Sequence, residues 1–492
     1  MRGERKLRIR GWLLAVSSGV MVLVASVAGP LSEPAQASGS PSIYTAASSF
    51  SGPFTAGHVI EPLTALPTNL AANGYVEQEF SAAGTAHAFL ATAAPSNGKW
   101  SIAPTSSAPY STRILVRRPA DPKKFSGTVI VEWMNESAGE SAPDWDYLNP
   151  EIVDAGDAWV GVSAQTLGVN GGKSLLTGGE VTGSVQGLTQ QEPQRYGSLH
   201  QPGDQYSFDI YDQVAFGLRD SPSKVLGPLR PHHILAVGES QSASYLTTFA
   251  DTLEPHDYPY DGIFIHSRGL SGAPLDGASI TASAAQTPLL IRTDLRVPVF
   301  MSETQTDLIM LGYAPAQQPN TDRIRTWEIA GTSHADIYEV GGNAGVLGCT
   351  APINTGPQHV VVQAGFADFS RWVDAGTPPP EPKPFELQST NPPTLALDQH
   401  GNVIGGVRTP AVDVPTSTLT GSAPAGTSTI CSLFGTTTPF TAEQLTSLYG
   451  SDANYLSKYT ASLDKTIAEK YLLPSERGEL LAQARQVQFP SS

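Results

Sequence analysis

Ser240 stands at the centre of the pentapeptide Gly-Glu-Ser-Gln-Ser, residues 238–242, where an apolar run at 234–237 meets a helical pattern that continues to Leu253. A sharp strand-to-helix turn lifts a serine hydroxyl clear of a sheet, and small residues on either side relieve the strained backbone. Ser242 fills the second small position, where glycine is the usual residue. The segment therefore predicts a nucleophilic serine. The alternative interpretation is that Ser240 only caps a helix.

A serine hydroxyl is a weak nucleophile, so it needs a general base and an acid that orients the base. At strand-turn-helix sites the acid and then the histidine follow the serine along the chain. Asp307 lies 67 residues after Ser240, and His334 lies 27 residues further on. Each follows an apolar run that predicts a strand, so the three side chains are expected to meet at the carboxyl ends of parallel strands. Glu303 competes for the role of the acid, but we favour Asp307 because it lies beyond the strand, in the loop. The alternative for His334 is a loop histidine without a role.

The oxyanion of an acyl-transfer reaction needs two hydrogen-bond donors. The first is expected to be the backbone N–H of Gln241, the residue after the serine. The second is expected from Asn135 or Glu136, which follow the apolar run at 129–133. Asn135 also begins a glycosylation sequon, but a glycan there would block the predicted site, so we discount that interpretation. This chemistry requires no metal ion and no organic cofactor.

Apolar, β-branched runs alternate with helical patterns through the middle of the chain, which is typical of an α/β protein with a parallel sheet buried on both faces. Helical periodicity is clear at residues 148–156, 206–220 and 360–376. The predicted strands lie at residues 111–119, 127–135, 157–164, 232–237, 260–267, 297–303 and 324–331.

The predicted domain organisation follows these patterns. Residues 1–37 form an export signal, and 38–110 a β-rich extension. Residues 111–378 form the catalytic core of a mostly parallel, doubly wound sheet, with a Gly- and Gln-rich lid candidate at 165–195. Residues 379–492 form a hairpin that turns at residues 400–402 and a helical decoration from residue 441 onward.

The first 37 residues carry the features of a signal peptide. Five basic residues precede an apolar stretch from Trp12 to about Ala28, and the small residues Ala35 to Ala37 supply a cleavage site. An uncleaved anchor helix is the alternative. Because this segment holds five basic and two acidic residues, its removal changes the formal charge from −16 to −19. Such an acidic chain is a poor candidate for binding nucleic acid or an anionic membrane.

Cys349 and Cys431 are the only two cysteines of the chain. In an oxidising compartment a single disulfide between them is expected, and two separate buried thiols are the alternative. The disulfide would clip the C-terminal decoration to the region that follows His334.

The sequence resembles the bacterial alpha/beta hydrolase domain family of predicted esterases over roughly residues 111–378. The segments that carry the resemblance include VEWMNESAGESAPDWDYL, AWVGVSAQ, AVGESQSA, IHSRG, RTDLRVPVFMSETQTD and GTSHAD. In that family serine is usual at the second small position, so Ser242 no longer counts against catalysis. The resemblance implies Ser240 as nucleophile and His334 as base, and it leaves the acid open between Asp307 and Glu303.

Together these patterns predict a secreted serine hydrolase that cleaves small-molecule or polymer carboxylic esters through a Ser-His-Asp triad and an acyl-enzyme. Acyl transfer to an alcohol by the same triad is one alternative. A noncatalytic module that uses the crevice to hold a polymer is another, since a fold alone does not decide function. No nucleic-acid partner is expected, and no membrane association after signal cleavage.

Overall fold

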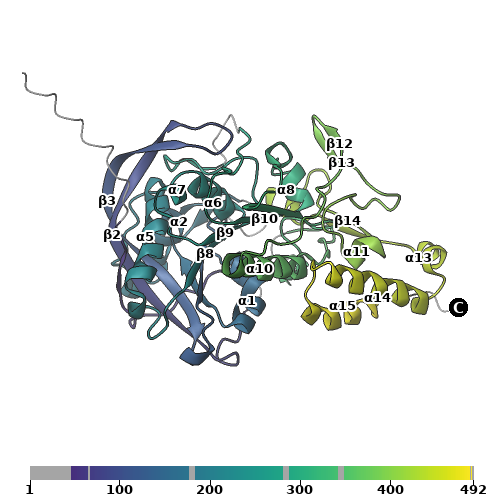
Figure 1. Cartoon of the computed structure of the whole chain (residues 1–492), viewed down its shortest axis with the longest axis horizontal. Helices are drawn as coiled ribbons and strands as arrows, with labels where there is room; N and C mark the ends of the chain where they lie inside the picture. Colours follow the sequence, from purple (N-terminus) through teal and green to yellow (C-terminus); the bar gives the residue numbers. More distant parts are fainter. Residues whose placement is uncertain are drawn as a thin grey trace, which may run out of the picture. The chain divides into compact units, whose positions relative to one another are not determined.

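A nine-stranded sheet runs through the protein in the order β1-β2-β3-β5-β4-β8-β9-β10-β11 (Figure 1). The structure is a computed structural model that describes residues 46–64, 67–176, 183–280, 287–341, 348–487 and 489. The predicted signal segment lies outside these residues. The strands are β1 (Ser49–Ser51), β2 (Tyr75–Ala93), β3 (Ser101–Pro119), β4 (Thr128–Trp133), β5 (Ala158–Val162), β8 (His233–Glu239), β9 (Gly262–His266), β10 (Val299–Glu303) and β11 (Ile324–Glu328).

The strand directions confirm the predicted mostly parallel α/β sheet. β5, β4, β8, β9, β10 and β11 run parallel to one another, whereas β1, β2 and β3 pair antiparallel at one edge. From β4 the chain first crosses to β5 on one side and later returns to β8 on the other side. The order of strands therefore reverses between β4 and β8. Ligands of open α/β sheets bind in the crevice at the carboxyl ends of strands at such a point.

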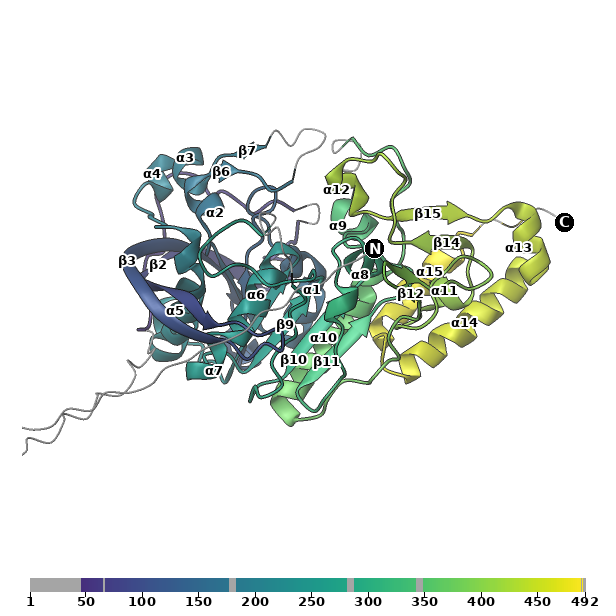
Figure 2. The ribbon, with the colours of Figure 1, turned by 90° about the horizontal axis from the view of Figure 1, so that it is seen from above.

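Helices cover both faces of this sheet, with α1 and α10 on one side and α5 and α6 on the other (Figures 1 and 2). The helices that pack on the sheet are α1 (Pro143–Ala155), α5 (Ser207–Asp220), α6 (Gln241–Asp251) and α10 (Gln358–Ala375). The other α-helices are α2 (Thr166–Asn170), α3 (Leu188–Gln191), α4 (Pro193–Tyr196), α7 (Glu254–Asp257), α8 (Gln305–Ile309), α9 (Ile337–Val340), α11 (Pro410–Asp413), α12 (Thr429–Ser432), α13 (Ala442–Tyr449), α14 (Asp452–Ala468) and α15 (Arg477–Ala484).

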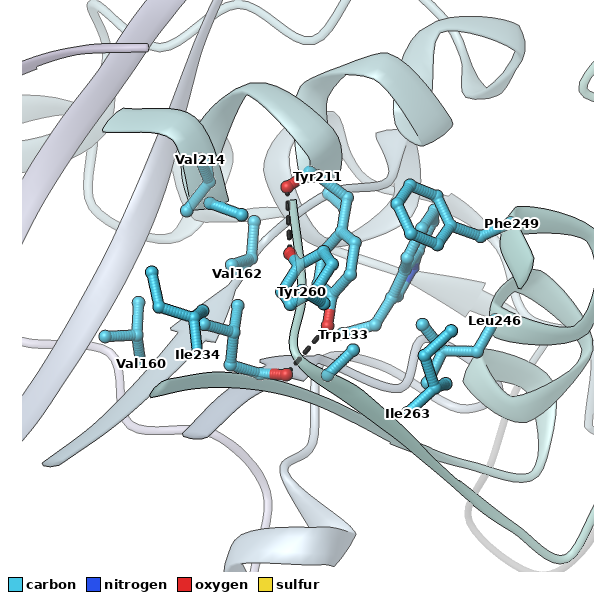
Figure 3. Packing of buried hydrophobic residues seen from close by; sticks show 14 of the residues in the cluster. Trp133, Val160, Val162, Tyr211, Val214, Ile234, Leu246, Phe249, Tyr260 and Ile263 are labelled. Atoms are coloured by element: carbon cyan, nitrogen blue, oxygen red, sulfur yellow. Dashed lines mark hydrogen bonds between the residues drawn. The ribbon is translucent and has the colours of Figure 1, made fainter. Parts of the chain in front are cut away.

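Alternate residues of the central strands enter two separate apolar cores. In β4, Val129 and Val131 pack toward α5 and α6, while Ile130 packs toward α1 and α10. This follows from the two-residue period of a strand, and it explains why these strands read as continuous apolar runs. Figure 3 shows the first core, where the hydroxyl of Tyr211 donates to the carbonyl of Val131 (2.7 Å) and the hydroxyl of Tyr260 donates to the carbonyl of Tyr211 (3.0 Å).

Helix α1 begins five residues earlier than the pattern at 148–156 predicts. Pro143 opens the helix, and the buried carboxylate of Glu132 accepts from the N–H groups of Asp144 (3.0 Å) and Trp145 (2.8 Å). These donors have no partner inside the helix, so the acceptor on β4 allows the first turn to form there. The start of α1 is therefore set by a contact with another element, and local sequence periodicity does not reveal such a contact.

The edges of the sheet also differ in detail from the sequence expectations. The predicted boundary between residues 110 and 111 falls inside β3, because β2 and β3 pair along most of their length. The chain does reverse direction near residues 400–402, where Leu397 forms an antiparallel bridge with Val403 and the N–H of Asp398 donates to the carbonyl of Asn402 (2.8 Å). The remaining strands form three small sheets, β6 (Gly172–Lys173) with β7 (Ser184–Val185), β12 (Leu387–Thr390) with β13 (Pro393–Leu395), and β14 (Ser417–Thr420) with β15 (Thr436–Pro439).

The C-terminal helices occupy the segment that composition predicted to be helical. Apolar side chains of α13, α14 and α15 belong to the same core as α1 and α10. Across the described parts of the chain, no helix combines the length and the apolar character needed to cross a membrane.

Candidate active site

Ser240 lies between β8 and α6 in a strained backbone conformation, with φ of 58° and ψ of −112°. Its N–H donates to the carbonyl of His266 on the neighbouring strand β9 (2.9 Å). A Cβ added to Gly238 would lie 2.9 Å from Cδ1 of Leu246 and 3.1 Å from the Cβ of Ser242, so this position of the turn requires glycine. Ser240 occupies the N-cap position of α6, but its side chain makes no capping bond. The hydroxyl is therefore available for another partner.

That partner is the imidazole of His334. Oγ of Ser240 lies 2.8 Å from Nε2, and Nδ1 lies 2.6 Å from Oδ1 of Asp307. Since an ionised carboxylate only accepts hydrogen bonds, the proton of the neutral ring lies on Nδ1, and Nε2 accepts from the serine hydroxyl. Ser240 and His334 are 94 positions apart in the sequence, yet the structure brings them and Asp307 together. In this geometry His334 can act as the base that takes the serine proton.

Asp307 is held by its own helix. Thr304, the N-cap of α8, donates to Oδ2 of Asp307 from its backbone N–H (2.7 Å) and from its hydroxyl (2.8 Å). The other oxygen of Asp307 faces His334. Burial alone would raise the pKa of Asp307, but the charge of His334, its hydrogen bond and those from Thr304 outweigh burial, and the pKa is lowered from its ordinary value. The carboxylate is ionised at neutral pH.

Glu303, the competing acid, lies at the end of β10 and does not reach the histidine. Both of its carboxyl oxygens are buried. Burial, and secondly the charge of Asp307, raise the pKa of Glu303 well above its usual value. The geometry therefore favours Asp307 for the acid.

The predicted oxyanion donors lie at the adjacent ends of β4 and β8, but two of the three are engaged. The N–H of Asn135 donates to the carbonyl of Ser141 (2.9 Å), and the N–H of Glu136 donates to the side-chain oxygen of Gln241 (3.0 Å). The N–H of Gln241 belongs to the first turn of α6, where no intrahelical acceptor exists. To donate to an oxyanion, the N–H of Asn135 or Glu136 must therefore give up its present hydrogen bond or share it between two acceptors.

A cavity of about 380 Å³ opens over Ser240 and His334. Its size lies in the range of pockets that bind small molecules. The loop after β4 supplies one side of the lining, including Asn135 and Ser137. Leu176, from the predicted lid segment, also lines the cavity, and its N–H donates to the carbonyl of Ser137 (3.1 Å). The mobility of that segment stays a prediction.

Carboxyl groups line another side of the cavity. Burial raises the pKa of Asp146 to about 7, against a hydrogen bond from Thr64 and the charge of Arg117. Burial and the charges of Asp336 and Asp146 raise the pKa of Glu339 to about 8. These carboxyls bring no positive charge to the cavity, and any of them that ionises would repel an anionic substituent.

Glu239, the residue before the candidate nucleophile, also lines the cavity. Its Oε1 lies 3.3 Å from Nε2 of His334, and its Oε2 accepts from the side-chain amide of Asn135 (3.2 Å). Burial, followed by the charges of surrounding carboxyls, raises the pKa of Glu239 well above its usual value. Sequence reasoning assigned this residue no role, and its place inside the elbow motif was the available signal.

The sequence interpretation also missed the C-terminal contribution to the cavity. Ile430, Leu433 and Phe434, in and just after α12, line it although they lie in the segment described as decoration. Nothing in their local pattern marked them. Three tryptophans of the segments near the site lie in the core and do not line the cavity, with exposed fractions of 2 % or less: Trp133, Trp145 and Trp159.

Cys349 and Cys431 form a disulfide, as the sequence predicts. Cys431 lies in α12, so the bond attaches the wall of the cavity to the chain that follows α9. Among the residues that the structure describes, no group of His, Cys, Asp and Glu side chains has an arrangement that could hold a metal ion.

Comparison with known proteins yields a family match. The model of a family described as "Alpha/beta hydrolase domain" matches residues 50–482, whereas no curated protein matches. Among solved structures, a CE15 glucuronoyl esterase from Teredinibacter turnerae T7901 is 13% identical and has a TM-score of 0.27, over 58% of this chain and 74% of that one. A thermostable esterase from Pseudomonas putida ECU1011 is 10% identical with a TM-score of 0.28, over 54% and 75%. A glucuronoyl esterase from Solibacter usitatus is 8% identical with a TM-score of 0.28, over 57% and 80%.

Proposed function

The chain belongs to the alpha/beta hydrolase domain family, and from this membership we propose that it is a serine hydrolase that cleaves carboxylic esters. The observation that carries the proposal is the hydrogen-bonded chain from Ser240 through His334 to Asp307 at the floor of a cavity. The strained backbone of Ser240 supports it, because such strain persists where the surrounding structure over-determines it and is concentrated at functional sites.

In the proposed reaction Oγ of Ser240 attacks the ester carbonyl carbon while its proton passes to Nε2 of His334. The carbonyl oxygen becomes an oxyanion, which the N–H of Gln241 and a donor from Asn135 or Glu136 stabilise. Collapse of this intermediate breaks the bond to the alcohol oxygen, which takes the proton from Nε2. Water then repeats the sequence on the acyl-enzyme and releases the acid. Asp307 holds the ring and stabilises its charged form throughout.

Export from the cell belongs to the same proposal. The signal-like segment at residues 1–37 supports it, and the disulfide between Cys349 and Cys431 agrees with an oxidising compartment.

Covalent labelling tests the proposed function. A small organophosphonate should modify Ser240 alone, because its phosphonyl oxygen occupies the oxyanion position while the serine displaces the leaving group. Mass spectrometry of the digested adduct should locate the label, and Ser240→Ala should remove both the label and at least ~10³-fold of the esterase kcat. A folded wild-type protein that takes up no phosphonate and hydrolyses no ester would leave the noncatalytic binding module as the better interpretation. Product analysis with an added alcohol would reveal acyl transfer.

A further inference from the structure

The segment 428–434, which contains α12, forms an apolar wall of the cavity over Ser240. Ile430, Leu433 and Phe434 line the cavity, and each side chain is at least nine-tenths buried. They belong to one apolar cluster with Ala335 and Val340, which line the same cavity from the loop after β11 and from α9. The three residues of this wall that line the cavity offer an apolar contact area and carry no hydrogen-bonding side chain.

The same wall is attached to both neighbours of the candidate base. The hydroxyl of Ser333 donates to the carbonyl of Phe434 (3.1 Å), and the N–H of Ala335 donates to the carbonyl of Leu433 (3.3 Å). The disulfide of Cys431 with Cys349 holds α12 from its other side. The wall therefore has a defined position relative to His334, and the group that packs against it has a defined position relative to the reacting atoms.

The polar groups around the cavity restrict what can pack there. Its lining includes the carboxyls of Asp146, Glu239 and Glu339 and, in the part of the chain that the structure describes, neither lysine nor arginine. An ester with a free carboxylate or phosphate would face these groups without a cation to pair with, which costs free energy in a partly desolvated site. An uncharged apolar chain meets no such cost and gains from burial.

We propose that the 428–434 wall binds the uncharged apolar chain of the ester substrate, and that Ile430 and Leu433 limit the length of that chain. This proposal rests on the proposed hydrolase function and names the substrate class of the same site. The wall contacts the substrate and takes no part in proton transfer.

A series of p-nitrophenyl acyl esters from acetate to octanoate tests the proposal. For the wild type, kcat/KM should rise by roughly fourfold per methylene until the wall is covered and then fall. Ile430→Ala, which shortens the wall, should move the preferred chain to a longer one and change the ratio of long-chain to short-chain kcat/KM at least tenfold. Leu433→Ala is the second variant should the first fail to fold. Ile353→Ala is the matched control, because Ile353 belongs to the same cluster but does not line the cavity, and its chain-length preference should equal that of the wild type.

Two further sets of substrates test which part of the ester lies on the wall and whether a charged chain is accepted. Alkyl acetates with the same chain lengths distinguish an alcohol chain on the wall from an acyl chain, since only the series whose chain occupies the wall should respond to Ile430→Ala. p-Nitrophenyl hemisuccinate should react at least tenfold more slowly than the butyrate ester.

The outcomes separate the two proposals. Hydrolysis at rates independent of chain length, or equal chain-length profiles for the Ile430→Ala, Leu433→Ala and Ile353→Ala variants, would contradict the proposed role of the wall. Neither result would contradict the proposed hydrolase function. Preference for the hemisuccinate would overturn the uncharged substrate class. Absence of hydrolysis of every ester by the folded wild type would overturn the proposed function together with the wall.

Discussion

Two buried carboxyls four residues apart, Glu303 and Asp307, have pKa values shifted in opposite directions by their surroundings. The carboxylate of Asp307 has hydrogen bonds from Thr304 and His334, which favour the charged form. Glu303 is fully buried, and desolvation together with the charge of Asp307 outweighs the charge and the backbone N–H of Arg268, which favours the neutral form. An ionised carboxylate that accepts a hydrogen bond from Nδ1–H stabilises an imidazolium, which a neutral acid does not do, so side-chain environment separates two candidates that sequence left open.

Asp307→Asn should lower kcat by at least about 10³-fold, because an amide in place of the carboxylate favours the wrong tautomer of His334. Glu303→Gln should stay within a few-fold of the wild type, since it replaces a neutral acid by a neutral amide of the same shape. Steady-state kinetics on one p-nitrophenyl ester checks both variants, with circular dichroism to show that each is folded. The reverse order of the two losses would assign the acid to Glu303.

At the scale of elements, the turn between β8 and α6 depends on the size of its flanking residues. Gly238 and Ser242 face each other across the turn, with only 3.1 Å between the Cβ of Ser242 and a Cβ added to Gly238. The hydroxyl of Ser242 is buried and has no hydrogen-bond partner among the described residues. What the turn requires at position 242 is therefore a small side chain, and the hydroxyl contributes nothing visible.

Ser242→Ala should keep kcat/KM within about threefold of the wild type and should not lower the free energy of unfolding, because removing an unpaired buried hydroxyl costs little. Ser242→Val should destabilise the protein by about 1–3 kcal/mol, the usual cost of overpacking, and should lower kcat/KM by at least tenfold as the turn shifts. Urea unfolding and ester kinetics measure the two effects, and the alanine variant is the control for the valine variant. Equal activity of both variants would show that the turn tolerates bulk at this position.

At the scale of the whole molecule, the sheet order brings distant residues to one crevice. Ser240 follows β8, Asp307 follows β10, and His334 follows β11, and these strands lie parallel in one sheet. The disulfide closes a loop of 82 residues around the C-terminal wall, for which loss of loop entropy in the unfolded chain predicts stabilisation of about 4 kcal/mol.

Buried carboxyls also shape the stability of the whole molecule. Burial raises the pKa of Asp157 to about 7, against a hydrogen bond from Ser126. The folded protein therefore binds a proton on Asp157 that the unfolded chain has released above pH ~4. The stability from this proton is complete below that pH and is lost as the pH rises through about 7, at up to ~1.4 kcal/mol per pH unit.

Asp157→Asn removes this titration, so the free energy of unfolding should fall less steeply between pH 4 and pH 7 than in the wild type. Urea unfolding at several pH values in this window measures the slope. The exposed residue Asp322 provides the control, and Asp322→Asn should leave the slope unchanged. A wild-type slope in the Asp157→Asn variant would show that this carboxyl does not titrate as burial predicts.

The sequence by itself determined the α/β class, the central strands and the turn that presents Ser240, because two-residue and helical periodicities and small turn residues are local properties. It also determined the two cysteines that pair. Only the tertiary structure decided between Asp307 and Glu303, engaged the N–H groups of Asn135 and Glu136, and placed the 428–434 wall over the serine. These features depend on the order of strands and on contacts such as those of Asp307 with His334, 27 positions apart, and of Glu136 with Gln241, 105 positions apart. Local periodicity does not encode such contacts.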